Sequence, residues 1–213
     1  MLVTRPNHDV TTNYLFYWSL QLIGIATRKG VTVYDLVGDK SNRARVESYM
    51  RKKSPSLVFL NGHGAENVVT GHNDSPLISS VDTSLSLYSG SVVYARSCRS
   101  GVGLGPALVA SGATAYIGYT DDFIFFRRDD FTTTPLRDPV AKYFLEPSNL
   151  IVSTLLKGKT TREAQKRSKK AMYKNLGKML SSDAGIDERN MAPFLWSNIN
   201  SQTLIGSVEA KLR

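Results

Sequence analysis

Cysteine is almost absent from this sequence, which holds a single one, Cys98, among its 213 residues. A lone thiol excludes an internal disulfide and a thiolate-based zinc site. Two interpretations of Cys98 remain. It is either an inert residue that packs like a small apolar side chain, which is the commoner role of a free cysteine, or a nucleophile. The residues around it must decide between them.

Long apolar runs are also missing. The longest, Leu20 to Ala26, is interrupted by Gln21 and is far too short to cross a bilayer. Residues 1–9 lack the basic start and the apolar middle of a signal peptide. We therefore expect a cytoplasmic protein with no membrane partner.

Positive charge is in excess. Lys and Arg number 27 against 18 Asp and Glu, which gives a net charge of +9. Such an excess can favour binding to a nucleic acid or to an acidic protein, or it can contribute to solubility alone. The sequence has neither an RNA-binding motif nor aromatic residues interleaved with the basic ones, so we expect a solvated face, and nucleic acid is not the expected partner. Basic residues every four positions form one stripe of a predicted helix: Arg162, Lys166, Lys170, Lys174 and Lys178.

Apolar, β-branched runs alternate with helical patterns in the first 120 residues. This rhythm predicts a mostly parallel sheet with helices on both faces. The predicted fold class is α/β, a three-layer α/β/α sandwich with a central sheet of about six strands, in a single domain over residues 1–213. Strands are predicted over residues 2–3, 31–37, 57–60, 91–95 and 113–119, and helices over residues 12–29, 41–53 and 104–111.

Two other regions have their own patterns. Residues 62–90 are rich in Asn, Gly, Ser and Asp, which predicts a small hairpin with loops. The last third is predicted to be mainly helical, and Thr160 with Glu163 forms a capping box that opens its longest helix. The predicted elements are short helices over 138–145 and 149–157, a helix over 160–180, and an edge strand around Leu204 within 193–206.

Two predicted strands end in chemically distinctive residues. One runs directly into Asn61-Gly62-His63-Gly64, and the other into Arg96-Ser97-Cys98-Arg99-Ser100-Gly101. Reactive groups of a parallel sheet collect at the carboxyl ends of its strands, and neighbouring strands lie about 5 Å apart. If the two strands are neighbours, the thiol of Cys98 and the imidazole of His63 can act on one substrate. The amides of Gly64 and Cys98 are then candidate donors to an oxyanion.

These motifs resemble the His-Gly and Ser-Cys signatures of the caspase, metacaspase, gingipain and separase clan of cysteine peptidases, and of its bacterial CHAT-type members. The resemblance is specific between about Val31 and Tyr119. It implies that Cys98 is the nucleophile, that His63 is the general acid and base, and that the Gly64 and Cys98 amides form the oxyanion hole. It further implies protein or peptide substrates, a thioester intermediate and no cofactor. Hydrolysis and ligation share that thioester, so both stay open.

Arg96 departs from the metacaspase-like pattern, in which an acidic residue at this position helps to bind a basic P1 side chain. An arginine at the end of an apolar strand must be paired or must face a ligand. One interpretation is a pocket for an acidic P1 residue. The other is a structural ion pair with Asp9, Asp121 or Asp122, which lie near predicted strand ends. All four residues are candidates for substrate binding, and the P1 preference stays open.

The remaining polar residues predict no metal site. His72 has the alternative roles of a second catalytic or metal histidine, and His8 that of lining a subsite, but we interpret both as solvated loop histidines. Asp121 and Asp122 supply too few oxygens for calcium, which takes six to eight. A regulatory protein partner stays open. The alternative to a peptidase is a catalytically silent binding module of the same fold, whose basic helix holds an acidic or nucleic-acid partner.

Overall fold

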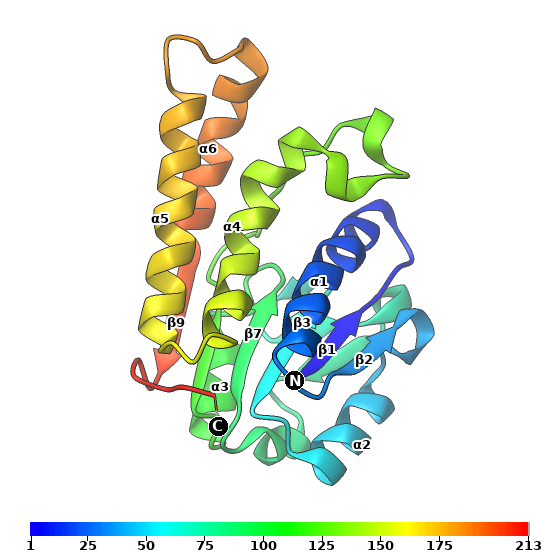
Figure 1. Cartoon of the computed structure of the whole chain (residues 1–213). Coiled ribbons are helices and arrows are strands. Elements are labelled where there is room, and N and C mark those ends of the chain that lie inside the picture. The colour runs from blue at the N-terminus through cyan, green and yellow to red at the C-terminus, as the bar shows by residue number, and fades with distance from the viewer. Residues whose placement is uncertain (213) are drawn as a thin grey trace.

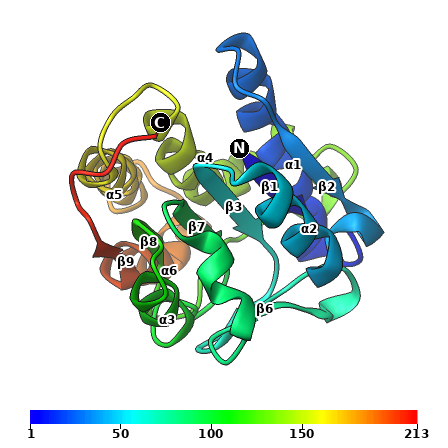
Figure 2. The ribbon, with the colours of Figure 1, turned by 90° about the horizontal axis from the view of Figure 1, so that it is seen from below.

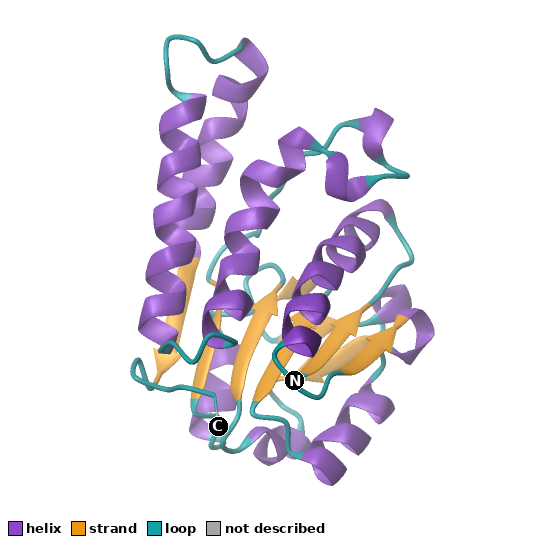
Figure 3. Cartoon of the chain, in the orientation of Figure 1, coloured by secondary structure: helices purple, strands orange, loops and turns teal. Residues whose placement is uncertain are grey.

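The computed structural model describes residues 1–212 and is built around one six-stranded sheet (Figure 3). Its strands are β1 (Leu2–Arg5), β2 (Tyr34–Val37), β3 (Leu57–Asn61), β7 (Val92–Arg96), β8 (Ala115–Tyr119) and β9 (Gln202–Gly206). They lie in the order β2-β1-β3-β7-β8-β9, and all pairs are parallel except β8 with β9. The predicted mostly parallel sheet of about six strands is confirmed.

Helices cover both faces of this sheet, as the end-on view in Figure 2 shows. They are α1 (Val10–Arg28), α2 (Arg43–Lys53), α3 (Leu104–Ala110), α4 (Pro139–Leu155), α5 (Thr161–Met179) and α6 (Ile186–Ser201). Helices α1, α4 and α5 lie on one face, and α2 and α3 on the other. The layers follow from strand periodicity, because Leu57 and Phe59 of β3 join the core under α1 while Val58 and Leu60 join the core under α2.

A second, small sheet follows β3. It consists of β4 (Gly64–Ala65), β5 (Val68–Thr70) and β6 (Pro76–Ser79), all antiparallel, and it agrees with the hairpin expected in this region. The short helical turn η2 (His72–Asp74) connects β5 to β6. Other such turns are η1 (Gly38–Lys40), η3 (Thr83–Tyr88), η4 (Asp129–Phe131) and η5 (Pro135–Arg137).

The C-terminal third corrects two predictions. The two short helices expected over 138–145 and 149–157 are the single helix α4, with Pro147 buried inside it. A proline breaks an isolated helix, but α4 packs against both α1 and α5, and this packing holds it together. Helix α6 was not predicted, since it carries Pro193 and has little apolar periodicity. The edge strand around Leu204 is confirmed as β9.

Helices α5 and α6 form an antiparallel hairpin that projects beyond the sheet (Figure 1). A cluster of buried side chains joins it to α4, among them Phe144, Met172, Leu195 and Ile199. The five stripe residues predicted to be solvated are all exposed on α5. Within residues 1–212, no helix combines the length and apolar character needed to cross a bilayer.

Candidate active site

The register between β3 and β7 fixes the position of both motifs. These two strands are parallel neighbours, with Asn61 opposite Arg96 at their carboxyl ends. His63 follows Asn61 by two residues, and Cys98 follows Arg96 by two. The two residues therefore leave the same edge of the sheet, side by side, as expected for neighbouring strands.

A carboxylate holds the imidazole of His63. The Nε2 of His63 lies 2.6 Å from Oδ2 of Asp9, in the loop between β1 and α1. A carboxylate only accepts hydrogen bonds, so Nε2 carries the proton that it donates. In the neutral ring, Nδ1 then keeps a lone pair, and His63 Nδ1 has no hydrogen-bond partner among residues 1–212.

Asp9 is itself fixed by the start of helix α1. Its side chain accepts from the amide of Thr12 at 2.6 Å, and the Thr12 hydroxyl accepts from the Asp9 amide at 3.1 Å, which completes a capping box. Partial burial acts to raise the pKa of Asp9, but the hydrogen bonds from Thr12 and His63 outweigh it and hold the pKa below its ordinary value. Asp9 is thus an anion at neutral pH and faces His63, not Arg96.

The loop after β7 turns sharply at the cysteine. Arg99 adopts a left-handed φ of 53°, and its amide donates to the carbonyl of Asp121. Below the turn, the buried hydroxyls of Ser97, Ser100 and Tyr116 form a chain with two contacts of 2.7 Å. Within residues 1–212 the amide of Cys98 donates to no protein acceptor, so it remains available to a ligand.

Gly64 lies directly against the cysteine loop. A Cβ at this position would sit 2.8 Å from the carbonyl oxygen of Cys98 and 2.9 Å from Cβ of Ser97. Only a residue without a side chain fits such a close approach. The backbone of Gly64 therefore runs beside the candidate nucleophile, Cys98.

The thiol of Cys98 is half-buried and lies near a carboxylate. Burial raises its pKa, and the nearby carboxylate of Asp122 acts in the same direction. The thiol also makes a long contact, 4.0 Å, with the carbonyl of Phe123, which acts to lower its pKa but does not outweigh burial. Asp122 pairs with Arg99 at 3.1 Å, and Asp121 accepts from the Asp122 amide at 2.8 Å. At neutral pH the resting sulfur therefore holds its proton.

Arg96 is a buried structural residue, which corrects the predicted acidic-P1 pocket. Its side chain has no exposed surface. The guanidinium donates to Asn61 Oδ1 at 2.7 and 3.0 Å, and to the Leu15 carbonyl at 3.2 Å. It also donates to Ser148 Oγ at 3.1 Å and Asn149 Oδ1 at 2.9 Å. A substrate cannot reach a group enclosed in this way.

The predicted ion pair of Arg96 is wrong as well. Its partners among residues 1–212 are neutral oxygens, and Asp9, Asp121 and Asp122 bind other groups. Burial lowers the pKa of Arg96 to about 10, so the residue stays cationic at neutral pH. Neutral amide, hydroxyl and carbonyl oxygens accept its hydrogen bonds without a counter-ion. Pairing opposite charges in the sequence could not predict these neutral partners.

Two further histidines meet His63 at this edge. The ring of His8 lies 6.1 Å from that of His63 and 5.3 Å from that of His72, measured between centroids. The His8 side chain is only 10% exposed, so its interpretation as a solvated turn residue is wrong. Its Nε2 lies 3.3 Å from Oδ1 of Asp74. The sequence signal for this cluster was weak, since its members come from three separate loops.

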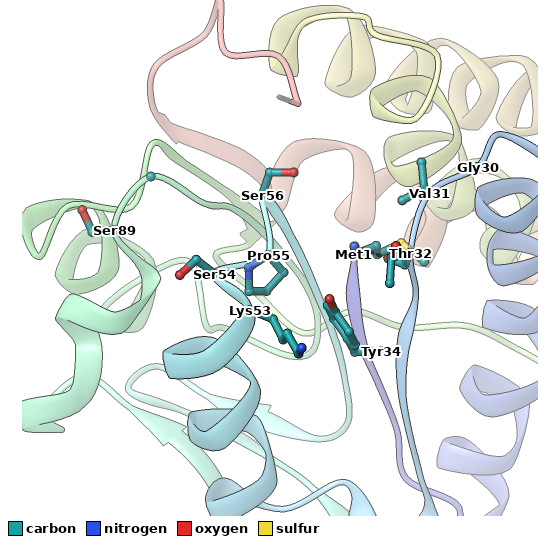
Figure 4. Close-up of a pocket in the computed structure, with 11 residues that line it drawn as sticks. Met1, Gly30, Val31, Thr32, Tyr34, Lys53, Ser54, Pro55, Ser56 and Ser89 are labelled. Carbon is teal, nitrogen blue, oxygen red and sulfur yellow. Dashed lines mark hydrogen bonds between the residues drawn. The ribbon is translucent and has the colours of Figure 1, made fainter.

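A surface hollow lies at the opposite end of the sheet from His63 and Cys98. A hollow of about 590 Å³ lies at the amino ends of β1 and β3, lined by Met1, Tyr34, Pro55 and neighbouring residues (Figure 4). His63 and Cys98 follow the carboxyl ends of the strands and do not line it.

A mostly parallel six-stranded sheet covered by helices on both faces is the fold expected from the resemblance to the caspase-like clan. The chain shares this fold with the Arg-specific cysteine proteinase gingipain R (RgpB), with a TM-score of 0.66 at 12% identity. The chain also shares the fold with a solved structure of the complex of the Porphyromonas gingivalis RgpB pro- and mature domains, with a TM-score of 0.62 at 13% identity. The resemblance to the caspase-like clan is thus confirmed for the fold.

The two matches cover 100% of this chain but 47% and 48% of the solved chains, so it spans about half their length. No protein-family model and no curated protein matches the sequence.

Proposed function

We propose that this protein is a cysteine endopeptidase in which Cys98 attacks the scissile carbonyl and His63 transfers the protons. The observation that carries the proposal is the register of β3 and β7, which sends both residues out of the same sheet edge. The chain shares its fold with a cysteine proteinase, gingipain R, and this similarity supports the proposal. A lone cysteine that packed as an inert residue would have no reason to follow the strand beside His63.

The reaction follows from these groups. On substrate binding, His63 accepts the Cys98 proton, and the sulfur forms a bond to the carbonyl carbon. The imidazolium then returns the proton to the leaving amine as the C–N bond breaks, leaving a thioester. Water, deprotonated by His63, attacks the thioester and frees the acid and the thiol. An amine in place of water would give ligation by the same path.

Asp9 is a positioning residue in this proposal. Its contact with Nε2 holds the ring and leaves Nδ1 as the nitrogen that exchanges protons with sulfur and substrate. The anionic carboxylate also stabilises the imidazolium formed during the reaction. The helix α1 capping box keeps Asp9 in place before substrate arrives.

The amides of Gly64 and Cys98 are the proposed oxyanion donors. The Cys98 amide has no protein acceptor among the described residues, and the Gly64 backbone lies against the same loop. Donors fixed in advance at the developing charge contribute about 3–4 kcal/mol each to lowering the barrier.

A basic P1 side chain fits the charges of this edge better than an acidic one. The enclosed guanidinium of Arg96 offers no anion site. Carboxylates of Asp9, Asp74 and Asp122 instead reach the surface near His63 and Cys98, with 38%, 60% and 45% of their side chains exposed. The fold neighbour gingipain R is itself Arg-specific.

The test is to incubate the purified protein with a complex peptide library and to map the new termini by mass spectrometry. Cys98→Ala, checked for an unchanged circular-dichroism spectrum, is the matched control. We expect cuts after basic residues that vanish in the control. Cuts that persist in C98A would refute the nucleophile, and cuts after acidic residues would refute the P1 assignment.

A second function is favoured by one observation on the α5–α6 hairpin. Tyr173 and Trp196 are 48% and 49% exposed beside the basic stripe, with ring centroids 6.1 Å apart. Exposed aromatic rings next to cations are typical of surfaces that bind single-stranded nucleic acid. Binding of a fluorescent oligonucleotide that weakens with salt, and is lost in Trp196→Ala, would support this role; no binding at low salt would exclude it.

A further inference from the structure

Three potential metal ligands converge beside the proposed catalytic histidine. One ring nitrogen each of His8 and His63 and a carboxylate oxygen of Asp74 all lie within 4.8 Å of one another. His8 and His63 follow β1 and β3 of the parallel sheet, and Asp74 lies in η2, between β5 and β6 of the small sheet. Ligand atoms of a tetrahedral zinc ion lie about 3.3 Å apart, given bonds of about 2.0–2.1 Å. His8 Nε2 and Asp74 Oδ1 already have that separation, 3.3 Å.

His8 is held in place for such a role. Its side chain is nine-tenths buried, and its Nδ1 has no hydrogen-bond partner among the described residues. The His8 amide donates to the Thr12 hydroxyl at 3.1 Å, which ties the loop to the capping box of α1. The other ring nitrogen, Nε2, faces Asp74 Oδ1 at 3.3 Å and is the one placed to bind a metal.

Asp74 is presented by an unusual backbone. Asn73 and Asp74 both adopt left-handed conformations, with φ of 52° and 54°. Two successive non-glycine residues in this region are uncommon, and such conformations cluster at ligand-binding sites. The Thr70 hydroxyl lies 3.4 Å from Asp74 Oδ1 and 3.3 Å from the His63 carbonyl, so β5 links Asp74 to the His63 loop.

We propose that His8, His63 and Asp74 bind one zinc ion, which withdraws His63 from catalysis. Two imidazoles and one carboxylate are a ligand set that suits zinc, and water completes the tetrahedron. His63 and Asp74 have 40% and 60% of their side chains exposed, so an ion from solvent can reach both. Asp9, whose Oδ2 lies 3.8 Å from His8 Nε2, adds negative charge beside the ion.

The inhibitory effect rests on the proposed peptidase function, while the binding of zinc does not. A neutral imidazole that holds a metal on one nitrogen keeps its proton on the other, so it has no lone pair left to accept a proton. Zinc on His63 therefore blocks both deprotonation of Cys98 and protonation of the leaving group. The proposed peptidase would be inhibited reversibly, with no covalent change.

Binding is measured first, by titrating Zn²⁺ into the metal-free full chain with isothermal calorimetry. We expect one site per chain and an at least tenfold higher Kd in His8→Ala and in Asp74→Asn, since even residues behind the ligands change metal affinity about 10- to 100-fold. Asp74→Asn keeps the size of an exposed side chain, so it tests the site even if His8→Ala disturbs the fold. Unchanged zinc affinity in either folded variant would overturn the proposal.

Two control variants define the ligand set. His72→Asn removes the third histidine but keeps an acceptor for the Asn7 amide, which lies 3.4 Å from His72 Nδ1. Cys98→Ala removes the only thiol. Both are expected to bind zinc as tightly as the parent. Loss of zinc binding in C98A would show that the sulfur is a ligand. Loss in H72N would show that His72 is a ligand in place of His8 or Asp74. Either result would overturn the assignment.

Inhibition is measured in the peptide-cleavage assay with micromolar Zn²⁺. Cleavage by the parent should fall and return on addition of EDTA, and Asp74→Asn, referred to its own zinc-free rate, should need at least tenfold more zinc. Equal zinc sensitivity of the two proteins would refute the inhibitory role. If the parent cleaves nothing, the peptidase proposal fails, and calorimetry still decides whether the zinc site exists.

Discussion

The carboxylate of Asp9 and the imidazole of His63 lie 2.6 Å apart, although 54 residues separate them in the chain. The same carboxylate caps helix α1 through the amide of Thr12. One side chain thus joins the start of a long helix to the candidate active site. The proposed general base is oriented by the fold itself before any substrate is present.

Asp9→Asn is expected to lower kcat about 10- to 1,000-fold and to change KM little, because the amide can no longer stabilise an imidazolium or fix the tautomer. Asparagine caps helices as well as aspartate does, so the melting temperature should change little. Peptide-cleavage kinetics and thermal melting check both. Thr12→Val, which removes the reciprocal capping hydroxyl and leaves the carboxylate, should instead lower the melting temperature more than kcat. Full kcat in D9N would contradict the positioning role.

The raised pKa of Cys98 predicts how the thiol reacts with pH. Only the thiolate is alkylated, so the rate with iodoacetamide should rise with pH and reach half its maximum above the ordinary thiol value of about 8.5. Asp122→Asn removes a carboxylate that raises this pKa, so its midpoint should be lower than the parent's. Asp121→Asn makes the same charge change at the adjacent residue and should leave the midpoint of the pH profile unchanged. A midpoint below 8 in the parent would be the contrary result.

Gly64→Ala should damage activity far more than stability. The added methyl would meet the Cys98 carbonyl oxygen at 2.8 Å, so the two loops must separate and the proposed oxyanion donor moves. Loss of one such donor costs about 10²- to 10³-fold in kcat. Gly177→Ala is a matched control, since a Cβ there meets nothing within 4 Å, and it should stabilise α5 by about 0.5–1 kcal/mol without affecting cleavage. Equal kcat in both variants would exclude the close approach of Gly64.

Arg96→Met is expected to destabilise the protein by about 3–5 kcal/mol in urea unfolding. The substitution leaves the buried oxygens of Asn61 and Asn149 without their donor, and such losses are costly. Arg99→Met, which removes a half-exposed arginine paired with Asp122, should cost less than about 1 kcal/mol. Comparable losses in the two variants would contradict the structural role assigned to Arg96.

The sequence predicted the sheet and the two strand-end motifs well, because both depend on local patterns. Buried parallel strands show as short apolar runs, and the residues after them must lie at one edge. The partners of Arg96 and His63 were not predictable in the same way. Asn149 reaches Arg96, and Asp9 reaches His63, only after helices α4 and α1 pack on the sheet, and no spacing in the sequence encodes that contact.

The half-buried, protonated state of Cys98 has a consequence for the life of the protein under oxidative stress. Peroxide attacks the thiolate, not the thiol, and oxidation beyond the sulfenic acid is irreversible for most cysteines. If Cys98 is the nucleophile that we propose, a sulfur that keeps its proton until substrate binds meets peroxide as a thiolate only during turnover. The sequence holds one cysteine, so no second thiol of the chain can form a rescuing disulfide, and a resting thiol that resists oxidation would preserve active enzyme.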